Sequence, residues 1–209
     1  MKHEWKKHEK HIYLPKSTPE IVHIPSFKFF TINGEGNPND DFFSEFIAVL
    51  YSLSYGIKMS PKKGMVPTGY FDYTVYPLEG IWDINDEAKK SFNGTINKND
   101  LVFKLMIRQP DFVEYEFAMQ ILENTKRNKP NELLEKVRFE EITDGESIQM
   151  LHIGSYDNEP ETFKVMEEFA DKNGYKRKTK IHREIYLSDA RKVSAEKLKT
   201  VLRFSIDKK

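Results

Sequence analysis

The sequence predicts an α+β fold in which two strand-helix-strand-strand modules, related by a pseudo-twofold axis, form one antiparallel sheet. Two observations lead to this prediction. The order strand, helix, strand, strand occurs twice along the 209 residues. In each repeat the helix has one apolar stripe and closes at a glycine, Gly56 in the first and Gly174 in the second. Because both helices then lie on one face of the sheet, we expect a ligand groove on the other face.

The first module is predicted over about residues 21–110. Its elements are strands at residues 27–32, 70–79 and 101–109 and a helix at residues 42–56. The helix follows Asn39, Asp40 and Asp41, which are typical of a helix start. Residues 101–109 are apolar on both faces, as is typical of a central strand that is covered on both sides.

The second module is predicted over about residues 146–209, and a helical connector at residues 111–128 precedes it. Its elements are strands at residues 147–153, 179–187 and 200–206 and a helix at residues 158–174. The charged residues 138–145 are expected to form the boundary between the two halves. We therefore interpret residues 21–209 as a single domain made of two modules.

Residues 1–20 are charged and contain two prolines, so we expect an N-terminal arm that lies over the body at a few points. Twenty residues are too few for a helix-turn-helix, which argues against a transcription regulator. The N-terminus lacks the apolar core of a signal peptide, and no later segment is apolar for long enough to span a bilayer. The sequence therefore predicts a cytoplasmic protein without a membrane partner.

Composition argues against several further classes of protein. The chain has no cysteine, which excludes a disulfide framework, thiolate catalysis and cysteine-ligated zinc. Its 33 basic and 33 acidic residues balance, so nucleic acid is not expected as a partner. The chain is rich in aromatic residues, with 15 Phe, 10 Tyr and 2 Trp. So many tyrosines indicate surfaces that are half apolar and half polar, as in clefts that bind small molecules.

Two glutamates are the candidate catalytic residues, and each lies near the end of the third element of its module. They are Glu79 and Glu184. Because strand side chains alternate, Glu184 shares one face with His182 and Tyr186. By the same alternation the side chains on the face of Glu79 are Phe71, Tyr73 and Val75. Two carboxylates would then face each other across a groove that is walled by aromatic rings.

The chemistry of these glutamates depends on their exposure to water. A carboxyl group that is partly removed from water has a raised pKa and can act as a general acid or base near neutral pH, or as the counter-charge of a cationic ligand. The alternative is that both glutamates lie on a solvated sheet surface and pair with Arg183 or Lys180. Spacing alone leaves both interpretations open.

Aromatic faces can hold a flat or cationic ligand, and the rings near the two glutamates are candidates for this role. Trp82 follows Glu79 closely but is out of phase with it unless Gly80 bulges the strand, so a tryptophan of the core is an equally good interpretation. The six histidines do not have metal-ligand spacing. We therefore predict neither a metal nor a cofactor.

Four stretches resemble, in order, motifs of the GyrI-like small-molecule-binding family. They are residues 27–38, 76–82, 105–112 and 183–189, with the sequences FKFFTINGEGNP, YPLEGIW, LMIRQPDF and REIYLSD. The resemblance covers nearly the whole chain. It implies the pair of modules described above with a ligand groove at the pseudo-twofold axis, and it matches the groove carboxylate of that family to Glu184.

The resemblance also implies a function. The family includes effector domains of multidrug-responsive regulators and gyrase inhibitors, and a stand-alone branch resembles hydrolases that open the cyclopropane of DNA-alkylating antibiotics. In such an enzyme a flat substrate would stack among four aromatic residues, Tyr73, Trp82, Tyr115 and Tyr186. Glu184 or Glu79 would activate water, and the other glutamate or a tyrosine hydroxyl would stabilise the charge on the dienone oxygen.

Two alternatives remain open at this point. A non-catalytic protein could bind or sequester flat, cationic compounds in the same groove, with the glutamates as counter-charges. A gyrase-inhibitor-like interaction protein would need a distinctive surface, and the sequence contains no strongly apolar or charged patch that suggests one.

Overall fold

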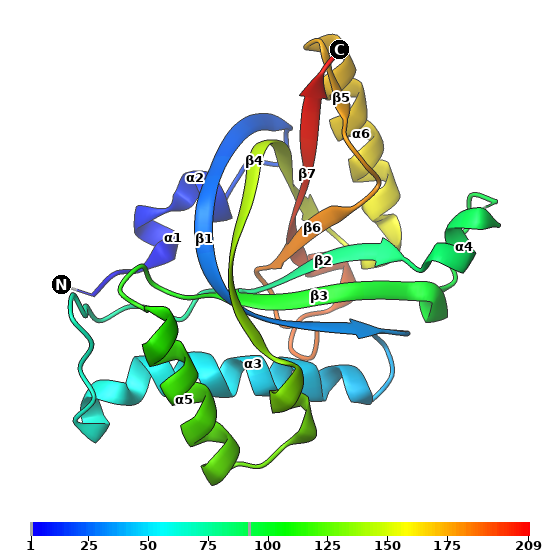
Figure 1. Ribbon diagram of the computed structural model, residues 1–209. Coiled ribbons are helices and arrows are strands. Elements are labelled where there is room, and N and C mark those ends of the chain that lie inside the picture. Colours follow the sequence, from blue (N-terminus) through cyan, green and yellow to red (C-terminus); the bar gives the residue numbers. More distant parts are fainter. Residues whose placement is uncertain (1, 92) are drawn as a thin grey trace. The chain divides into compact units, whose positions relative to one another are not determined.

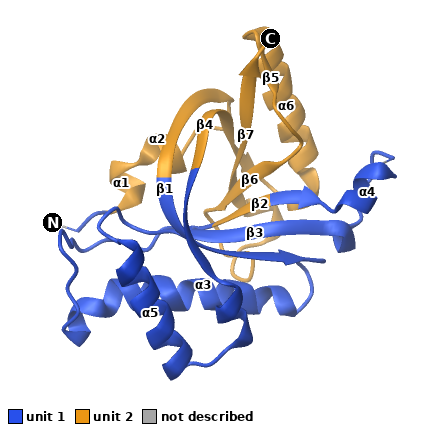
Figure 2. Ribbon diagram, in the orientation of Figure 1, with its two compact units in different colours: residues 1–3, 27–78, 82–142 blue, residues 4–26, 79–81, 143–209 orange. Residues whose placement is uncertain are grey.

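The computed structural model describes residues 2–91 and 93–209, and the chain forms two compact units (Figures 1 and 2). Unit 1 contains residues 1–3, 27–78 and 82–142, and unit 2 contains residues 4–26, 79–81 and 143–209. Three strands contribute residues to both units: β1 (Glu20–Glu35), β2 (Leu78–Ile84) and β4 (Arg138–Ile153). The units therefore do not follow the order of the chain.

Both units combine helices with antiparallel strands, so the predicted α+β class is confirmed. The further elements of unit 1 are α3 (Phe42–Met59), α4 (Asp86–Lys90), β3 (Leu101–Arg108) and α5 (Tyr115–Asn128). Those of unit 2 are α1 (Trp5–His8), α2 (Lys10–Tyr13), α6 (Glu159–Lys172), β5 (Tyr175–Arg177), β6 (His182–Tyr186) and β7 (Lys199–Lys208). The order strand, helix, strand, strand occurs as β1-α3-β2-β3 and again from β4 through α6 to β6 and β7, where the short β5 is additional.

The core of unit 1 lies between α3 and the antiparallel pair β1 and β3. Phe30 on β1 is opposite Ile107, and Ile32 is opposite Leu105. Leu105, Met106 and Ile107 are consecutive and all fully buried, which confirms that β3 is covered on both faces. Helix α3 packs on β3 and α5 with a stripe of buried side chains: Phe46, Val49, Leu50, Leu53 and Ile57.

Two glycines, Gly56 and Gly174, were predicted to end helices, and only Gly174 does so. Gly56 lies inside α3, which continues to Met59. A Cβ atom at Gly56 would lie only 2.8 Å from a methyl group of Ile121 on α5, so this glycine permits close packing of the two helices. Gly174 follows α6 with a φ of 78°, a conformation that favours glycine, and here the predicted helix end is confirmed.

Strand β7 is the centre of unit 2. It pairs antiparallel with β4, β5 and β6. Helix α6 packs beside these strands (Figure 1). The buried side chains at this contact come from β4, α6 and β7: Ile148, Met166, Ala170, Leu202, Phe204 and Ile206. Helix α6 and its neighbouring strands thus form a core of their own.

Two predicted segments differ in the structure. Residues 70–77 do not form a strand, and β2 begins only at Leu78. Residues 138–145 were expected to be a connector, but they are the first half of β4. Glu140 in this half has partners on two other strands, because its carboxylate accepts hydrogen bonds from Thr31 Oγ1 on β1 at 2.5 Å and from Lys104 Nζ on β3 at 2.9 Å. Charge density was therefore a poor sign of a loop.

The first residues of unit 2 are helical. Helices α1 and α2 bury Trp5, Ile12 and Tyr13. Over residues 2–91 and 93–209, every helix is too short or too polar to cross a lipid bilayer.

Candidate functional site

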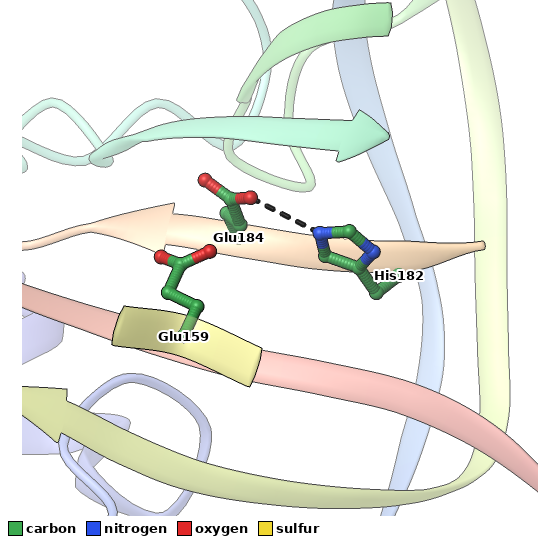
Figure 3. A group of neighbouring side chains, drawn as sticks. All are labelled: Glu159, His182 and Glu184. Atoms are coloured by element: carbon green, nitrogen blue, oxygen red, sulfur yellow. Dashed lines mark hydrogen bonds and ion pairs between the residues drawn. The ribbon is translucent and has the colours of Figure 1, made fainter. Parts of the chain in front are cut away.

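Three side chains with acid-base chemistry converge within unit 2 (Figure 3). Glu159 is the first residue of α6, and His182 and Glu184 lie on β6. Each offers a nitrogen or oxygen atom, and these three atoms all lie within 4.8 Å of one another. We call this group the carboxyl-histidine site.

His182 and Glu184 meet because they are two residues apart on one strand. This spacing places both side chains on the same face of β6, as predicted. The Nε2 atom of His182 lies 3.1 Å from Glu184 Oε1, at hydrogen-bonding distance. Pairing of β6 with β7, where Glu184 is opposite Leu202, holds the strand, and only 8% of the Glu184 surface is exposed.

Glu159 reaches the site from the start of a helix. A short 3-10 turn, Tyr156–Asn158, leads directly into α6, so the side chain of its first residue is held close to the turn. Only 6% of Glu159 is exposed. Burial raises the pKa of Glu159 well above its usual range, and the charge of Glu184 and a hydrogen bond to Glu184 raise it further.

The contact between these two carboxyl groups requires a proton. Two ionised carboxylates cannot hydrogen bond to each other, because both only accept. The raised pKa of Glu159 assigns the proton to that residue, so Glu159 donates and Glu184 accepts. Figure 3 shows the side chain of Glu159 extending from α6 toward Glu184. The site can therefore hold a proton on one carboxyl group and accept another on its neighbour.

Aromatic rings lie next to the carboxyl-histidine site. The ring of Phe163 on α6 meets His182 edge-on with a centroid distance of 4.7 Å. Tyr156 and Tyr186 form a second edge-on pair at 6.1 Å. Burial and the charge of Glu184 raise the pKa of Tyr156 to about 12, so its hydroxyl keeps its hydrogen at neutral pH and can donate it in a hydrogen bond.

The other predicted glutamate belongs to a buried network of charges in unit 2. Arg183 Nη1 donates a hydrogen bond to Glu79 Oε2 at 2.8 Å. The same guanidinium group binds both oxygens of Asp144, at 2.7 Å and 2.6 Å. Arg203 Nη1 also contacts Asp144, at 3.3 Å, and its other nitrogens donate to Gln149. Glu79 is 2% exposed.

Burial and pairing with the arginines shift the pKa values of the two carboxyl groups in this network. Burial raises the pKa of Glu79, and the charges of Arg183 and Arg203 offset part of this effect. Burial acts in the same direction on Asp144, but the two guanidinium groups outweigh it and lower the pKa of Asp144. The alternative that Glu79 pairs with Arg183 thus describes a real contact, but the pair is buried rather than solvated.

The structure does not bring Glu79 and Glu184 together on one face. Arg183 and Glu184 are consecutive on β6, so their side chains point to opposite faces, and Glu79 binds Arg183. The predicted face that Glu79 shares with Phe71 and Tyr73 is also wrong, because β2 begins only at Leu78 and alternation does not extend back to those residues.

The remaining aromatic candidates belong to unit 1. Trp82 is 5% exposed and packs against Phe43 and Phe103, so it is a core residue. Tyr73 is buried. Phe71 is partly exposed, and Tyr115, the first residue of α5, is 58% exposed. Only the last two offer substantial surface to a ligand.

Sequence reasoning missed Glu159. Asn158, Glu159 and Pro160 were interpreted only as the start of a helix, because acidic residues and proline are common there. The signal that could have identified Glu159 was its position at the first turn, from which it can point across to a neighbouring strand. No local pattern indicates that this strand is β6.

The carboxyl-histidine site also has residue types that bind divalent metal ions. Its donor atoms nevertheless bond to one another, through the contact of His182 with Glu184 and the hydrogen bond of Glu159 to Glu184. The same contacts also suit proton transfer between the three side chains.

Comparison with known proteins shows to which family of proteins this chain belongs. The antiparallel α+β fold is shared with solved structures over nearly the whole chain. The model of the GyrI-like small molecule binding domain matches residues 17–207, and the chain therefore belongs to the GyrI-like family of small-molecule-binding domains. A search of curated proteins finds no match.

Three similar structures come from Listeria innocua. Two are called hydrolases; each is 32% identical to this chain, with TM-scores of 0.88 and 0.89, and each alignment covers 99% of this chain and 100% of the other. The third is an uncharacterized conserved protein that is 34% identical, with a TM-score of 0.86 and the same coverage. The C-terminal domain of EcmrR, at 13% identity and a TM-score of 0.56 over 92% of this chain and 98% of that one, shares the fold alone.

Proposed function

We propose that this protein hydrolyses the cyclopropane ring of flat, aromatic, DNA-alkylating antibiotics and so detoxifies them. The observation that carries the proposal is the buried pair Glu159 and Glu184 with His182 beside it. Two similar Listeria innocua structures are called hydrolases, which supports hydrolytic chemistry. The substrate class follows from the resemblance of four motifs to the GyrI-like family, a stand-alone branch of which resembles hydrolases that open cyclopropane rings.

In this proposal Glu184 is the general base. Its carboxylate accepts a proton from a water molecule while the water oxygen attacks the CH₂ carbon of the strained ring. The carbon-carbon bond of the ring breaks, and its electron pair passes into the dienone, which becomes a phenolate. A proton from a tyrosine hydroxyl or from solvent then gives the phenol. The net reaction adds one water molecule to the substrate.

Glu159 and His182 orient the base. A hydrogen bond from Glu159 and a contact from His182 hold the Glu184 carboxylate, so little reorganisation is needed when it accepts the proton. After the attack, the proton on Glu184 can leave through the contact with His182, because Glu159 already carries its own proton. General base catalysis of this kind contributes on the order of a hundred- to ten-thousand-fold, and ring strain supplies further driving force.

Glu79 has a different part in this proposal. Its carboxylate is engaged by Arg183 in a buried ion pair, so we assign it to the architecture of unit 2 rather than to water activation. Tyr186 and Tyr156 are the aromatic residues beside Glu184 that we propose to contact the substrate. Phe71 and Tyr115 remain candidates for substrate binding because they are exposed.

The test is mass spectrometry of a cyclopropane-containing antibiotic of the duocarmycin type after incubation with the protein. We expect the wild type to add the mass of one water molecule and Glu184→Gln to lose this activity while still binding the compound. Glu168→Gln is the matched control, because Glu168 is an exposed residue of the same helix as Glu159. It should retain full turnover.

Other outcomes would contradict the proposal in defined ways. Compound that co-elutes with the wild-type protein but is chemically unchanged would indicate a binding or sequestering protein. Compound that is neither changed nor bound would favour an interaction protein of the gyrase-inhibitor type. Full activity of Glu184→Gln would rule out Glu184 as the base.

A further inference from the structure

His152 forms a buried link between β4 and the first turn of α6. It lies near the end of β4 and is almost fully buried. Its Nδ1 atom is 2.8 Å from Thr162 Oγ1, and its Nε2 atom is 3.0 Å from the carbonyl oxygen of Ser155. Both ring nitrogens are therefore engaged, one by the helix and the other by the turn that precedes it.

The chemistry of the partners defines these two hydrogen bonds. A carbonyl oxygen only accepts, so Nε2 of His152 donates to Ser155. The hydroxyl group of Thr162 can donate to Nδ1, which completes the link. A histidine in this arrangement holds two segments at a fixed separation, because its ring is almost fully buried and both of its hydrogen bonds are partly shielded from water.

These contacts lie on both sides of Glu159 in the chain. Ser155 is four residues before it, and Thr162 is three residues after it, which places Thr162 on the same side of α6. The chain enters the turn through Gly154 with a φ of 141°, and a Cβ atom at this position would lie 3.5 Å from Nε2 of His152. That distance is an ordinary van der Waals contact, so the positive φ rather than a lack of space favours glycine here.

We propose that His152 and Thr162 are positioning residues that hold Glu159 against Glu184 and thereby set the geometry of the base. The inference rests on the proposed function for its catalytic consequence. A displacement of about 1 Å at a reacting group can reduce a rate on the order of a hundred-fold, so loss of this link is expected to lower kcat.

The pH at which Glu159 titrates depends on its distance from Glu184 and on its exposure to water. Its titration therefore shows whether it has moved, even where no turnover is measured. The ionisable groups that face Glu159 are Glu184 and His182 on β6 and Asp157 and Tyr156 on the preceding turn. If the first turn of α6 moves away, water reaches Glu159 and Glu184 recedes. The midpoint of the Glu159 titration should then fall toward that of an ordinary glutamate.

The experiment compares Thr162→Val, which removes the hydroxyl group, with Thr162→Ser, which keeps it. Thr125→Val is the matched control, because Thr125 is a helix threonine of unit 1 whose hydroxyl donates to the carbonyl of Ile121 on its own helix. Each protein is assayed for kcat, KM and the pH dependence of kcat. In parallel, NMR of ¹³C-labelled glutamate follows the titration of Glu159, whose signal is assigned by its loss in Glu159→Gln.

We expect Thr162→Val to lower kcat at least ten-fold with KM nearly unchanged, and to lower the titration midpoint of Glu159. Thr162→Ser should restore both properties, and Thr125→Val should change neither. The inference is wrong if Thr162→Val titrates and turns over like the wild type, or if kcat falls while the Glu159 midpoint stays fixed. Should the wild type lack turnover, the proposed function fails, and the NMR midpoint alone decides whether the link positions Glu159.

Discussion

Arg183 on β6 and Arg203 on β7 lie directly opposite each other in an antiparallel pair, and both side chains are buried. Like charges in opposite positions of neighbouring strands are destabilising on their own. Asp144 resolves the conflict because its carboxylate binds both guanidinium groups, and Glu79 supplies a second negative charge to Arg183. Two arginines and two carboxylates thus balance inside unit 2.

Replacing Asp144 with asparagine is expected to destabilise the protein by about 3–5 kcal/mol, because it leaves the two buried arginines with a single carboxylate. Urea unfolding would measure this change. Asp207→Asn is the control, since Asp207 is exposed and its contact with Lys178 is long, at 3.7 Å, and it should change the free energy of unfolding by less than about 0.5 kcal/mol. Equal stability of the two variants would show that the arginines do not depend on Asp144.

Replacing Glu79 with glutamine should separate stability from turnover. Arg183 loses one charged hydrogen bond but keeps Asp144, so we expect a loss of about 2–3 kcal/mol in the free energy of unfolding. Measured below its melting temperature, Glu79→Gln should keep kcat within a few fold of the wild type. Under the same conditions Glu184→Gln should lose about a hundred-fold or more. A comparable loss of kcat in Glu79→Gln would return Glu79 to the candidate bases.

The stability of the protein should depend on pH through Glu159. Its native pKa is raised above its ordinary value of 4.5, so the native state keeps this proton over a range in which the unfolded chain has lost it. The contribution to stability is therefore complete below about pH 4.5 and is lost as the pH rises through the native pKa. Within this window the loss is about 1.4 kcal/mol for each pH unit.

Glutamine at position 159 cannot ionise and resembles the protonated carboxyl group. We expect Glu159→Gln to gain stability relative to the wild type as the pH rises from about 4.5, and the difference to become constant above the native pKa of Glu159. Urea unfolding at a series of pH values measures this difference in the free energy of unfolding. The curve of Glu168→Gln should run parallel to that of the wild type. A parallel curve for Glu159→Gln as well would mean that Glu159 ionises normally in the native state.

Substitutions of Trp82 and Tyr115 should separate a core residue from a surface one. Trp82→Ala removes ring contacts with Phe43 and Phe103 and should cost about 3–5 kcal/mol in the free energy of unfolding. Trp82→Phe keeps part of this packing and should cost less. Tyr115→Ala should leave stability within about 0.5 kcal/mol, because Tyr115 is largely exposed.

Ligand affinity then decides the role of Tyr115. If Tyr115 contacts the substrate as proposed, Tyr115→Ala will raise KM while the melting temperature stays constant. Val66→Ala is a suitable control, since Val66 is another exposed apolar residue of unit 1. An unchanged KM in Tyr115→Ala would remove this residue from the substrate-binding set.

The class of fold and two of the three residues of the carboxyl-histidine site could be predicted from the sequence. Apolar periodicity identified α3, α6 and the doubly covered β3, because burial imposes a regular spacing on side chains. Alternation along one strand was sufficient to place His182 and Glu184 on the same face, since both residues belong to a single local element. The four motifs indicated the GyrI-like family, which the match over residues 17–207 confirms.

Which carboxyl groups meet could not be predicted from the sequence, because it depends on long-range packing. Glu159 is 25 positions from Glu184 along the chain, and Glu79 is 104 positions from Arg183, yet each lies beside its partner. Contacts of this kind depend on how elements pack, and no local pattern encodes them. Burial then determines the chemistry: the same residue type holds a proton at Glu159 and balances an arginine at Glu79, because neighbouring charges and exclusion of water set the state of each carboxyl group.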